Sequence, residues 1–335
     1  MAELYPPGAH LLAPIAGLSD LPMRMACRKY GCRYAFTEMI DAGSLVFGSP
    51  KTLYLARRGE KEDFLGVQLV GSDPVTLERA THIINDMHFD VLDFNLGCPA
   101  PKVAKKEEGI TFALKHPDEA VKAVELLVKH SKIPVTVKTR IHSEQDPAPT
   151  VAFCKQLEST GIAALTLHGR IMRTFYSGPV YYDVIRAVRE SLRIPVIANG
   201  GGLTPASCQP LLTETGCERL MIARGALGNP WIFREVSGGE PPTVEEFTEQ
   251  LEHHVRSMIE FYGHDLGFRV CRKTVLEYLR GRGFPSALRA SVSTLMGWDA
   301  FGVLLDGIRQ GPSDRYWEFL EKYPDQVERK LKKTE

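Results

Sequence analysis

Eight short runs of apolar and β-branched residues, alternating with stretches of helical periodicity, constrain the fold of this chain more than any other feature. Residues 118–130 and 150–160 are two of the predicted helices, and Gly or Pro separates each helix from the run that follows it. This alternation is typical of βαβ units and a parallel sheet. The predicted strands are HLLAPI (10–15), YAFTEM (34–39), LGVQLV (65–70), VLDFNL (91–96), PVTVKT (134–139), AALTLH (163–168), PVIANG (195–200) and RLMIAR (219–224).

Eight strands with eight crossovers predict an α/β fold of the closed (β/α)8 TIM barrel class. A doubly wound open sheet is the alternative, but no Gly-x-Gly-x-x-Gly follows the first strand. The stretch GGEPP reads as a linker, after which strands cease and helical periodicity continues. We therefore predict a barrel catalytic domain over 1–237, a linker over 238–242 and a smaller helical domain over 243–335.

The composition is that of an ordinary globular protein, with 44% hydrophobic and 24% charged residues. No apolar run approaches the roughly 20 residues of a spanning helix, and the N-terminus lacks a basic start and an apolar core, so we expect a cytoplasmic chain without membrane contact. Seven scattered cysteines without a Cys-x-x-Cys pair predict reduced thiols and no metal site. We expect a monomer.

Polar side chains gather where the predicted strands end. In a parallel barrel these ends converge on one mouth, which is where barrel enzymes carry their function. A single polar residue of this kind is usually structural, but a whole ring of them would need a ligand to satisfy its hydrogen bonds. The candidate residues are Gln68, Asn95, Cys98, Lys138, Arg140, His168, Asn199 and Arg224.

The last two strands end in glycine-rich turns, Asn199-Gly200-Gly201-Gly202 and Ala223-Arg224-Gly225. Backbone N–H groups in such turns can approach a phosphate closely, with a cation beside them. A phosphate site after strands seven and eight is a recurrent barrel feature, and it suits the single phosphate of FMN. Turn geometry alone is the simpler explanation for either turn.

If FMN binds at these turns, residues at the other strand ends are predicted to contact the flavin. Lys138 would place positive charge near the flavin N1 and O2 atoms, where negative charge accumulates on reduction. Gln68 and His168 would donate hydrogen bonds to the ring edge or the phosphate. The turn Ala13-Pro14-Ile15 would lie against the isoalloxazine through its backbone.

A second candidate surface lies in the helical region. Residues 268–290 carry six basic residues against the single acidic Glu277. Four of them, Arg269, Arg272, Lys273 and Arg280, share a face at helical spacing, and Tyr278 adds an aromatic platform. This pattern predicts a phosphate-binding stripe; a solvated helix face is the alternative. Lys plus Arg and Asp plus Glu both total 41, so any RNA contact must come from such a local patch. The basic residues are Arg269, Arg272, Lys273, Arg280, Arg282 and Arg289.

Over residues 11–290 the chain resembles the dihydrouridine synthases. The segments that carry the resemblance are LAPIAGLSDLPMR (12–24), NLGCP (95–99), TVKTR (136–140), LHGR with YSGP (167–170 and 176–179), ARGALGNPW (223–231) and RKTVLEY (272–278). They stand in the family's order.

The resemblance implies that NADPH reduces FMN, which passes hydride to C6 of a uracil in RNA, most often tRNA. It assigns Cys98 as the acid that protonates C5, and a thiol with a reference pKa of about 8.5 is mostly protonated at neutral pH. Asn95 would orient the flavin or the uracil, and Arg140 and Arg170 would contact uracil carbonyls or the RNA backbone. The target base must be flipped out of its stack, with Arg272 and Lys273 holding the RNA.

Several positions depart from the family pattern. Ile15 stands where Met is common, and Gly201 replaces a frequent Asp. KKEEG (105–109) places Glu107 and Glu108 where basic residues are usual, and HSEQDPAP, after Arg140, is acidic and rich in proline. Two carboxylates beside an RNA groove would repel phosphate.

Alternative functions stay open at this point. One is an FMN-barrel reductase of a free small molecule, such as a dihydroorotate or enone reductase, against which the basic helix argues. Another is an RNA-binding protein that keeps the flavin fold without turnover, against which Cys98, Lys138 and His168 argue. Ribosomal RNA is the alternative to tRNA as substrate, and NADH the alternative to NADPH.

Overall fold

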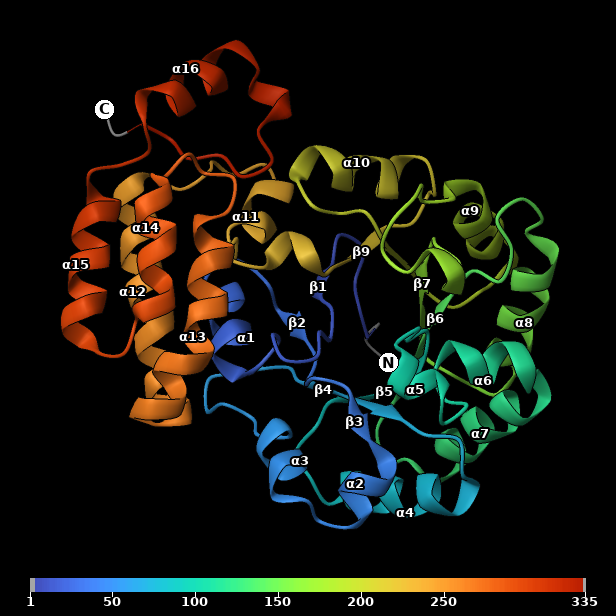
Figure 1. The fold of residues 1–335 in the computed structure, drawn as a ribbon. Coiled ribbons are helices and arrows are strands. Elements are labelled where there is room, and N and C mark those ends of the chain that lie inside the picture. The colour runs from blue at the N-terminus through green and yellow to red at the C-terminus, as the bar shows by residue number, and fades with distance from the viewer. Residues whose placement is uncertain (1–3, 334–335) are drawn as a thin grey trace. The chain divides into compact units, whose positions relative to one another are not determined.

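The computed structural model describes residues 4–333, so the outer limits of the predicted domains, residues 1 and 335, lie outside the described part. Nine strands, each parallel to its neighbours, form one sheet in the order β2-β1-β9-β8-β7-β6-β5-β4-β3, ringed by helices (Figure 1). The strands are β1 His10–Leu12, β2 Tyr34–Ala35, β3 Ile40–Asp41, β4 Gly66–Val70, β5 Val91–Leu96, β6 Val135–Arg140, β7 Ala164–His168, β8 Val196–Asn199 and β9 Arg219–Ile222.

The two ends of the sheet come from one predicted strand. YAFTEM (34–39) and the two residues after it form β2 and β3, and a parallel bridge between Phe36 and Gly66 joins them to β4. The sheet therefore curls into the eight positions of a TIM barrel, which confirms the predicted fold class. The strand is broken because side chains replace the ladder: the hydroxyl of Thr37 donates to Glu38 O (2.9 Å) and accepts from Gln68 N (3.2 Å).

Other predicted strands are shorter than expected. The first ends at Leu12, since Pro14 has no N–H to donate and Ile15 N donates to the hydroxyl of Ser19 (2.7 Å) instead of to a strand. The last ends at Ile222 and is followed by a 3-10 turn, Arg224–Ala226. The middle strands match closely, and β4 and β5 are buried along their whole length, as parallel strands covered on both faces are.

The barrel's helices are amphipathic and turn their apolar side to the sheet. In α4, for example, Leu77, Ala80 and Ile84 are buried at helical spacing, and the Asp73 carboxylate caps the helix by accepting from Thr76 N (2.8 Å). The helices associated with the sheet are α2 Ala42–Val46, α3 Pro50–Leu55, α4 Pro74–Asn85, α5 Pro101–Ala104, α6 Ile110–Lys115, α7 Pro117–His130, α8 Ala148–Ser159, α9 Tyr182–Ser191 and α10 Pro205–Thr213.

The chain divides into two compact units. The first holds the barrel, and the second holds residues 21–32, 203–206 and, within the described part, 224–333. The predicted linker 238–242 thus lies inside the second unit, and the helix at 21–28 belongs there as well. The division into domains at 1–237 and 243–335 stays a prediction.

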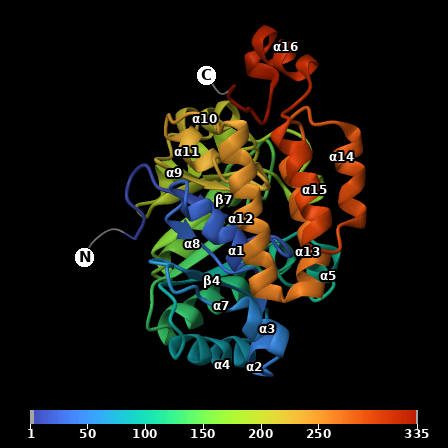
Figure 2. The ribbon, with the colours of Figure 1, turned by 90° about the vertical axis from the view of Figure 1, so that its left-hand side faces the viewer.

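The second unit is helical and has its own core. α12, α13 and α15 lie side by side in both views (Figures 1 and 2), around a cluster that includes Trp231, Phe247, Phe268, Val275 and Tyr278. Its helices are α1 Leu21–Arg28, α11 Ile232–Val236, α12 Val244–Tyr262, α13 His264–Leu279, α14 Ser286–Ser291, α15 Trp298–Arg309 and α16 Asp314–Lys322. Among residues 4–333 no helix is long and apolar enough to cross a membrane.

Candidate active site

The strand register places several predicted site residues side by side at the carboxyl ends of the barrel strands. Asn95 pairs with Lys138 across β5 and β6, Arg140 pairs with His168 across β6 and β7, and His168 pairs with Asn199 across β7 and β8. These side chains therefore converge at one end of the sheet, where the sequence predicts a site.

Cys98 lies in the loop that follows β5. The amide oxygen of Asn95 accepts hydrogen bonds from the backbone N–H of Gly97 (3.0 Å) and of Cys98 (2.8 Å), which closes a tight turn and fixes the cysteine relative to the strand. Of the seven cysteines, all within the described residues, Cys98 alone has appreciable exposed surface; the others are buried. It is therefore the thiol that a ligand at the strand ends can reach.

A chain of buried polar side chains holds Asn95 in place. Its amide nitrogen donates to Gln68 Oε1 (2.9 Å), and the amide of Gln68 donates to Asp93 Oδ2 (2.7 Å). Thr136 donates its hydroxyl to the other Asp93 oxygen (2.7 Å). Gln68 and Asn95 thus help to position the backbone of Cys98. Their predicted contact with the flavin stays a prediction. Sequence reasoning missed Asp93 and Thr136, although a carboxylate inside the apolar run VLDFNL is a visible signal.

Burial shifts the acidity of this region. Burial raises the pKa of the Cys98 thiol, an effect reduced by a hydrogen bond from the Ala100 N–H and by the charges of Arg140 and Lys138. Burial also raises the pKa of Asp93. A raised thiol pKa keeps Cys98 protonated at neutral pH, which is the state that a general acid requires.

Lys138 crosses the barrel interior to Asn199. Its Nζ donates to Asn199 Oδ1 (2.9 Å), and the Asn199 amide nitrogen donates to Met221 O (2.7 Å) on the adjacent strand. Burial, followed by repulsion from Arg140, lowers the pKa of Lys138 to about 8. The amine is thus a positive charge held in a poorly solvated place, where an anionic ligand atom would stabilise it.

The two arginines expected to contact substrate hold backbone carbonyls. In Arg140, Nε donates to Gly97 O (2.8 Å) and Nη1 donates to Phe175 O (2.7 Å). In Arg170, Nε donates to Gly178 O (3.0 Å). Arg140 therefore ties the Cys98 loop to the loop after β7. Contact of either guanidinium with substrate stays a prediction.

The turn after β8 is packed so closely against its neighbours that it requires glycine. Gly200 and Gly201 have φ of +116° and +78°. A Cβ on Gly200 would come within 2.8 Å of the His168 ring, and one on Gly201 within 3.0 Å of Val180. Bare backbone with positive φ is what a phosphate-cradling turn requires, so this part of the chain fits the phosphate of a flavin mononucleotide.

The other predicted flavin contacts lie near strand termini too. Ala13 extends the pairing of β1, its N–H donating to Ile222 O (2.8 Å), and Pro14 and Ile15 are partly exposed in the turn beyond. Ala223, Arg224 and Gly225 follow β9 directly, with the 3-10 turn beginning at Arg224. Their contact with a flavin stays a prediction.

The acidic departure at residues 105–109 is largely neutralised within the chain. Glu107 pairs with Lys115 (2.8 Å) and with His116 (3.3 Å), while Lys106 lies 2.5 Å from Asp41 and 4.0 Å from Glu108. Paired carboxylates repel phosphate far less than free ones do. The segment therefore does not present two bare negative charges.

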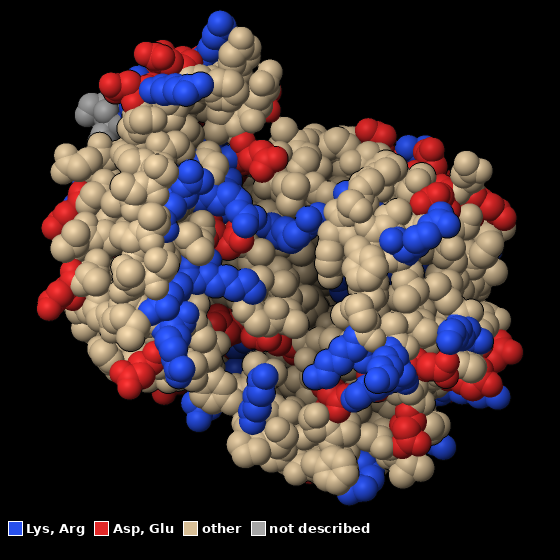
Figure 3. Space-filling model, viewed as in Figure 1, with Lys and Arg blue, Asp and Glu red and all other residues tan. Residues whose placement is uncertain are grey.

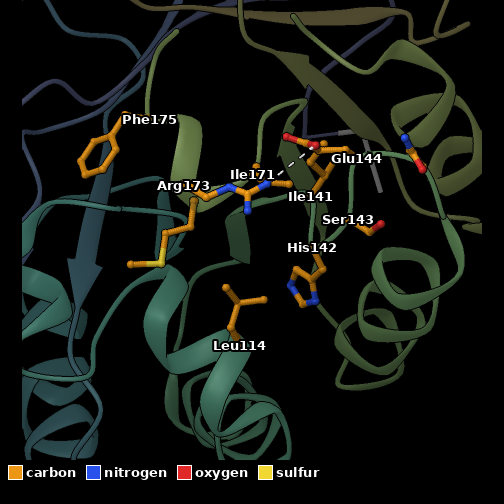
Figure 4. Close-up of a pocket in the computed structure, with 10 residues that line it drawn as sticks. Leu114, Ile141, His142, Ser143, Glu144, Ile171, Arg173 and Phe175 are labelled. Carbon is orange, nitrogen blue, oxygen red and sulfur yellow. Dashed lines mark ion pairs between the residues drawn. The ribbon is translucent and has the colours of Figure 1, made fainter. Parts of the chain in front are cut away.

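A cleft of about 840 Å³ lies beside the ends of β6 and β7 (Figure 4). His142 and Glu144, in the acidic and proline-rich segment after Arg140, line one side of the cleft. Phe175 and Arg173 line the other side, and Arg173 and Glu144 are 4.0 Å apart. Arg140 lies just before His142 in the chain and donates hydrogen bonds both to Phe175 O and to Gly97 O, so the cleft adjoins the Cys98 loop.

In the second unit, the predicted basic stripe is real only in part. Arg269 and Lys273 are exposed one turn apart on α13, and Figure 3 shows basic side chains gathered over this helix. Arg272 is half-buried, its Nε donating to Leu295 O (2.9 Å). Arg280, at the end of the helix, is exposed and pairs with Glu277 (3.0 Å).

The predicted aromatic platform is wrong, and one of the six basic residues is buried as well. Tyr278 is fully buried, with its hydroxyl 3.0 Å from His254 Nδ1, so it offers no platform for a base. Arg282 is also fully buried and binds Tyr278 O (2.7 Å) and Asn229 Oδ1 (2.8 Å). The apolar side of α13 faces the core, and helical spacing alone does not reveal which side that is.

A parallel barrel with a reachable thiol, a buried lysine amine and a glycine turn at its strand ends fits the class of flavin-binding oxidoreductases. The family model for dihydrouridine synthase matches residues 11–299, and the chain belongs to this family of flavin-dependent enzymes. The tRNA-dihydrouridine synthase B of Proteus vulgaris is 35% identical over 85% of this chain and 90% of its own length. That of Pectobacterium carotovorum is 36% identical over 81% and 86%.

Among solved structures, FabK from Thermotoga maritima aligns with a TM-score of 0.42 and 17% identity, covering 66% of this chain and 59% of its own.

Proposed function

We propose that this protein reduces uridine to 5,6-dihydrouridine in tRNA, with FMN as its flavin, NADPH as reductant and Cys98 as the acid. The relatives named for tRNA-dihydrouridine synthesis cover most of both chains, which supports tRNA over ribosomal RNA. The observation that carries the proposal is the single reachable thiol, held by Asn95 at the strand ends that also carry the glycine turn.

A bound flavin would supply the hydride that adds to C6 of the uracil. Addition at C6 leaves negative charge on C5 and O4, and C5 then takes a proton. The Cys98 thiol donates that proton, because its raised pKa keeps it protonated at neutral pH and the hydrogen bond from its backbone N–H to Asn95 holds the turn. The bonds from Asn95 and Arg140 to this loop hold the sulfur in place.

Lys138 has a separate role. Its ammonium group is costly to bury with only the neutral Asn199 amide as acceptor, and an electron-rich flavin ring edge nearby would stabilise it. The turn at Gly200 and Gly201 would supply N–H donors for the phosphate. His168, packed against Gly200, donates to the same ligand.

RNA contact falls to the exposed basic residues of the second unit, with Arg269 and Lys273 foremost. Phosphate contacts of this kind position RNA without reading its sequence. A uracil inside a stack hides C5 and C6, so the enzyme takes a flipped or unpaired base.

The decisive experiment combines purified protein, FMN, NADPH and total RNA from cells that lack the enzyme. We expect the holoprotein to be yellow and dihydrouridine to appear in the tRNA fraction. Dihydrouridine in ribosomal RNA alone would reassign the substrate. Reduction of free uracil or orotate derivatives without activity on RNA would favour a small-molecule reductase.

A further inference from the structure

Three potential metal ligands converge on the outside of the barrel. Glu78 and His82 lie one turn apart on α4, and His130 ends α7. Glu78 Oε1 is 3.8 Å from His82 Nε2 and 3.6 Å from His130 Nδ1, and the three ligand atoms all lie within 4.8 Å of one another. Both imidazoles thus place a nitrogen within 4 Å of the same carboxylate oxygen.

These separations do not suit hydrogen bonds, which require about 2.7–3.2 Å between nitrogen and oxygen. They do suit a shared cation. With Zn²⁺–N and Zn²⁺–O bonds of about 2.0–2.1 Å, the edge of a coordination tetrahedron measures roughly 3.4 Å. The two distances from Glu78 to the histidines exceed this value by a few tenths of an ångström, and the two histidine nitrogens lie within 4.8 Å of each other, so side-chain rotations must draw the three atoms together around an ion.

The backbone beneath the three residues is fixed. Asn85 links the ends of the two helices: its Nδ2 donates to His130 O (2.8 Å), and its Oδ1 accepts from Lys132 N (2.7 Å). Leu77 and Ile84 of α4 and Leu127 of α7 are fully buried beneath the cluster's helices. The helices therefore hold their spacing without an ion, so the site is preorganised.

We propose that Glu78, His82 and His130 form a binding site for a divalent transition metal ion, Zn²⁺ in particular, with solvent completing the coordination. Two imidazoles and one carboxylate are a ligand set that Zn²⁺ uses, whereas Mg²⁺ and Ca²⁺ prefer oxygen alone. The side chains of His82, Glu78 and His130 are 57%, 43% and 24% exposed, so an ion can enter from solvent.

The site lies away from the chemistry. His130 precedes β6 by a few residues, so the cluster is near the amino ends of the strands, the face of a barrel associated with stability. A metal there joins α4 to α7. It is a structural clip, bound only by the folded protein, and it raises the unfolding temperature as free Zn²⁺ rises.

The test is Zn²⁺ titration of the metal-stripped, FMN-loaded protein by calorimetry, alongside thermal unfolding with and without Zn²⁺. We expect one Zn²⁺ per chain at this site and a higher unfolding temperature. His82→Gln, His130→Gln and Glu78→Gln should each weaken the affinity at least about tenfold and abolish the thermal shift.

His116→Gln is the matched control, because His116 is an exposed histidine beside a carboxylate, Glu107, outside the three-ligand cluster. It should leave Zn²⁺ binding intact. Equal binding by the wild type and all three ligand variants would overturn the proposal, as would no binding by the wild type. Anomalous diffraction at the zinc edge should place the ion at Glu78; a peak at Cys98 instead would also overturn it.

Discussion

A methyl group on the Cα of Gly109 would lie 2.7 Å from the carbonyl oxygen of Cys98 and 3.2 Å from its Cβ. Gly109 therefore packs directly against the cysteine loop, and Ile110 N donates to the same carbonyl (3.3 Å). The position of the proposed acid thus depends on a glycine eleven residues further along the chain.

Gly109→Ala should displace the Cys98 loop and lower dihydrouridine formation by at least about tenfold, since small misplacements of reacting groups are costly. Gly48→Ala is the control for a positive φ: its φ of +66° is close to the +61° of Gly109, but no atom lies within 4 Å of the added carbon. Gly109 has a ψ of −134°, outside the left-handed helical region, so Gly109→Ala adds backbone strain to the close contact. Turnover and urea unfolding separate the two effects; equal turnover would show that the close packing does not position the thiol.

Cys98→Ala should leave reduction of the flavin by NADPH unchanged and slow dihydrouridine formation by about 10²–10⁴-fold, the usual contribution of a general acid. Stopped-flow absorbance follows the flavin in each half of the reaction. Cys154→Ala, at a buried cysteine away from the strand ends, serves as the control for removal of a thiol. An unimpaired second half-reaction in the Cys98 variant would remove the thiol from its role.

The lowered pKa of Lys138 predicts a pH dependence of stability in the flavin-free protein. Between pH 8 and about 10.4 the unfolded chain holds the proton on this amine while the folded chain has released it. The contribution of this group to the free energy of unfolding therefore increases as pH rises through that window. Lys138→Met should lack this gain while losing flavin affinity. Parallel pH profiles of urea unfolding for both proteins would contradict the buried charge.

Arg269→Glu with Lys273→Glu should weaken tRNA binding and reduce the slope of log K against log salt by roughly 0.7–0.9 for each phosphate that the protein no longer neutralises. Arg272→Gln is the informative comparison, because the Nε of Arg272 is already committed to Leu295 O. It should affect folding stability more than the salt slope. Affinities across a salt series decide; an unchanged slope in the double variant would assign this face of α13 to solvent.

Gly228→Ala should destabilise the helical unit severely. The added carbon would lie 2.2 Å from the carbonyl carbon of Glu277 in α13, and backbone cannot give way as a flexible side chain can. Gly281→Ala, with φ of +70° and nothing within 4 Å, isolates the cost of the backbone conformation. Thermal unfolding of the two variants should differ clearly; similar midpoints would mean that α13 can move away.

The motif ARGALGNPW illustrates how far sequence reasoning reaches. Its first half is predicted to bind phosphate, and its second half builds the helical unit. Asn229 accepts from the buried Arg282 (2.8 Å), and Trp231 is fully buried beside Phe247. One motif can thus supply both a candidate ligand site and part of a core, and only partners far along the chain separate the two uses.

The sequence by itself determined the barrel, its eight strand positions and the reachable cysteine loop, because alternation of strands and helices and the turn residues between them are local properties. Only the tertiary structure decided that Asp93 anchors Gln68 and Asn95, that Tyr278 and Arg282 are core rather than surface, and that Glu78, His82 and His130 meet. Each of these depends on which face of an element is turned inward and on partners distant in the chain, and neither follows from the spacing of residues within one element.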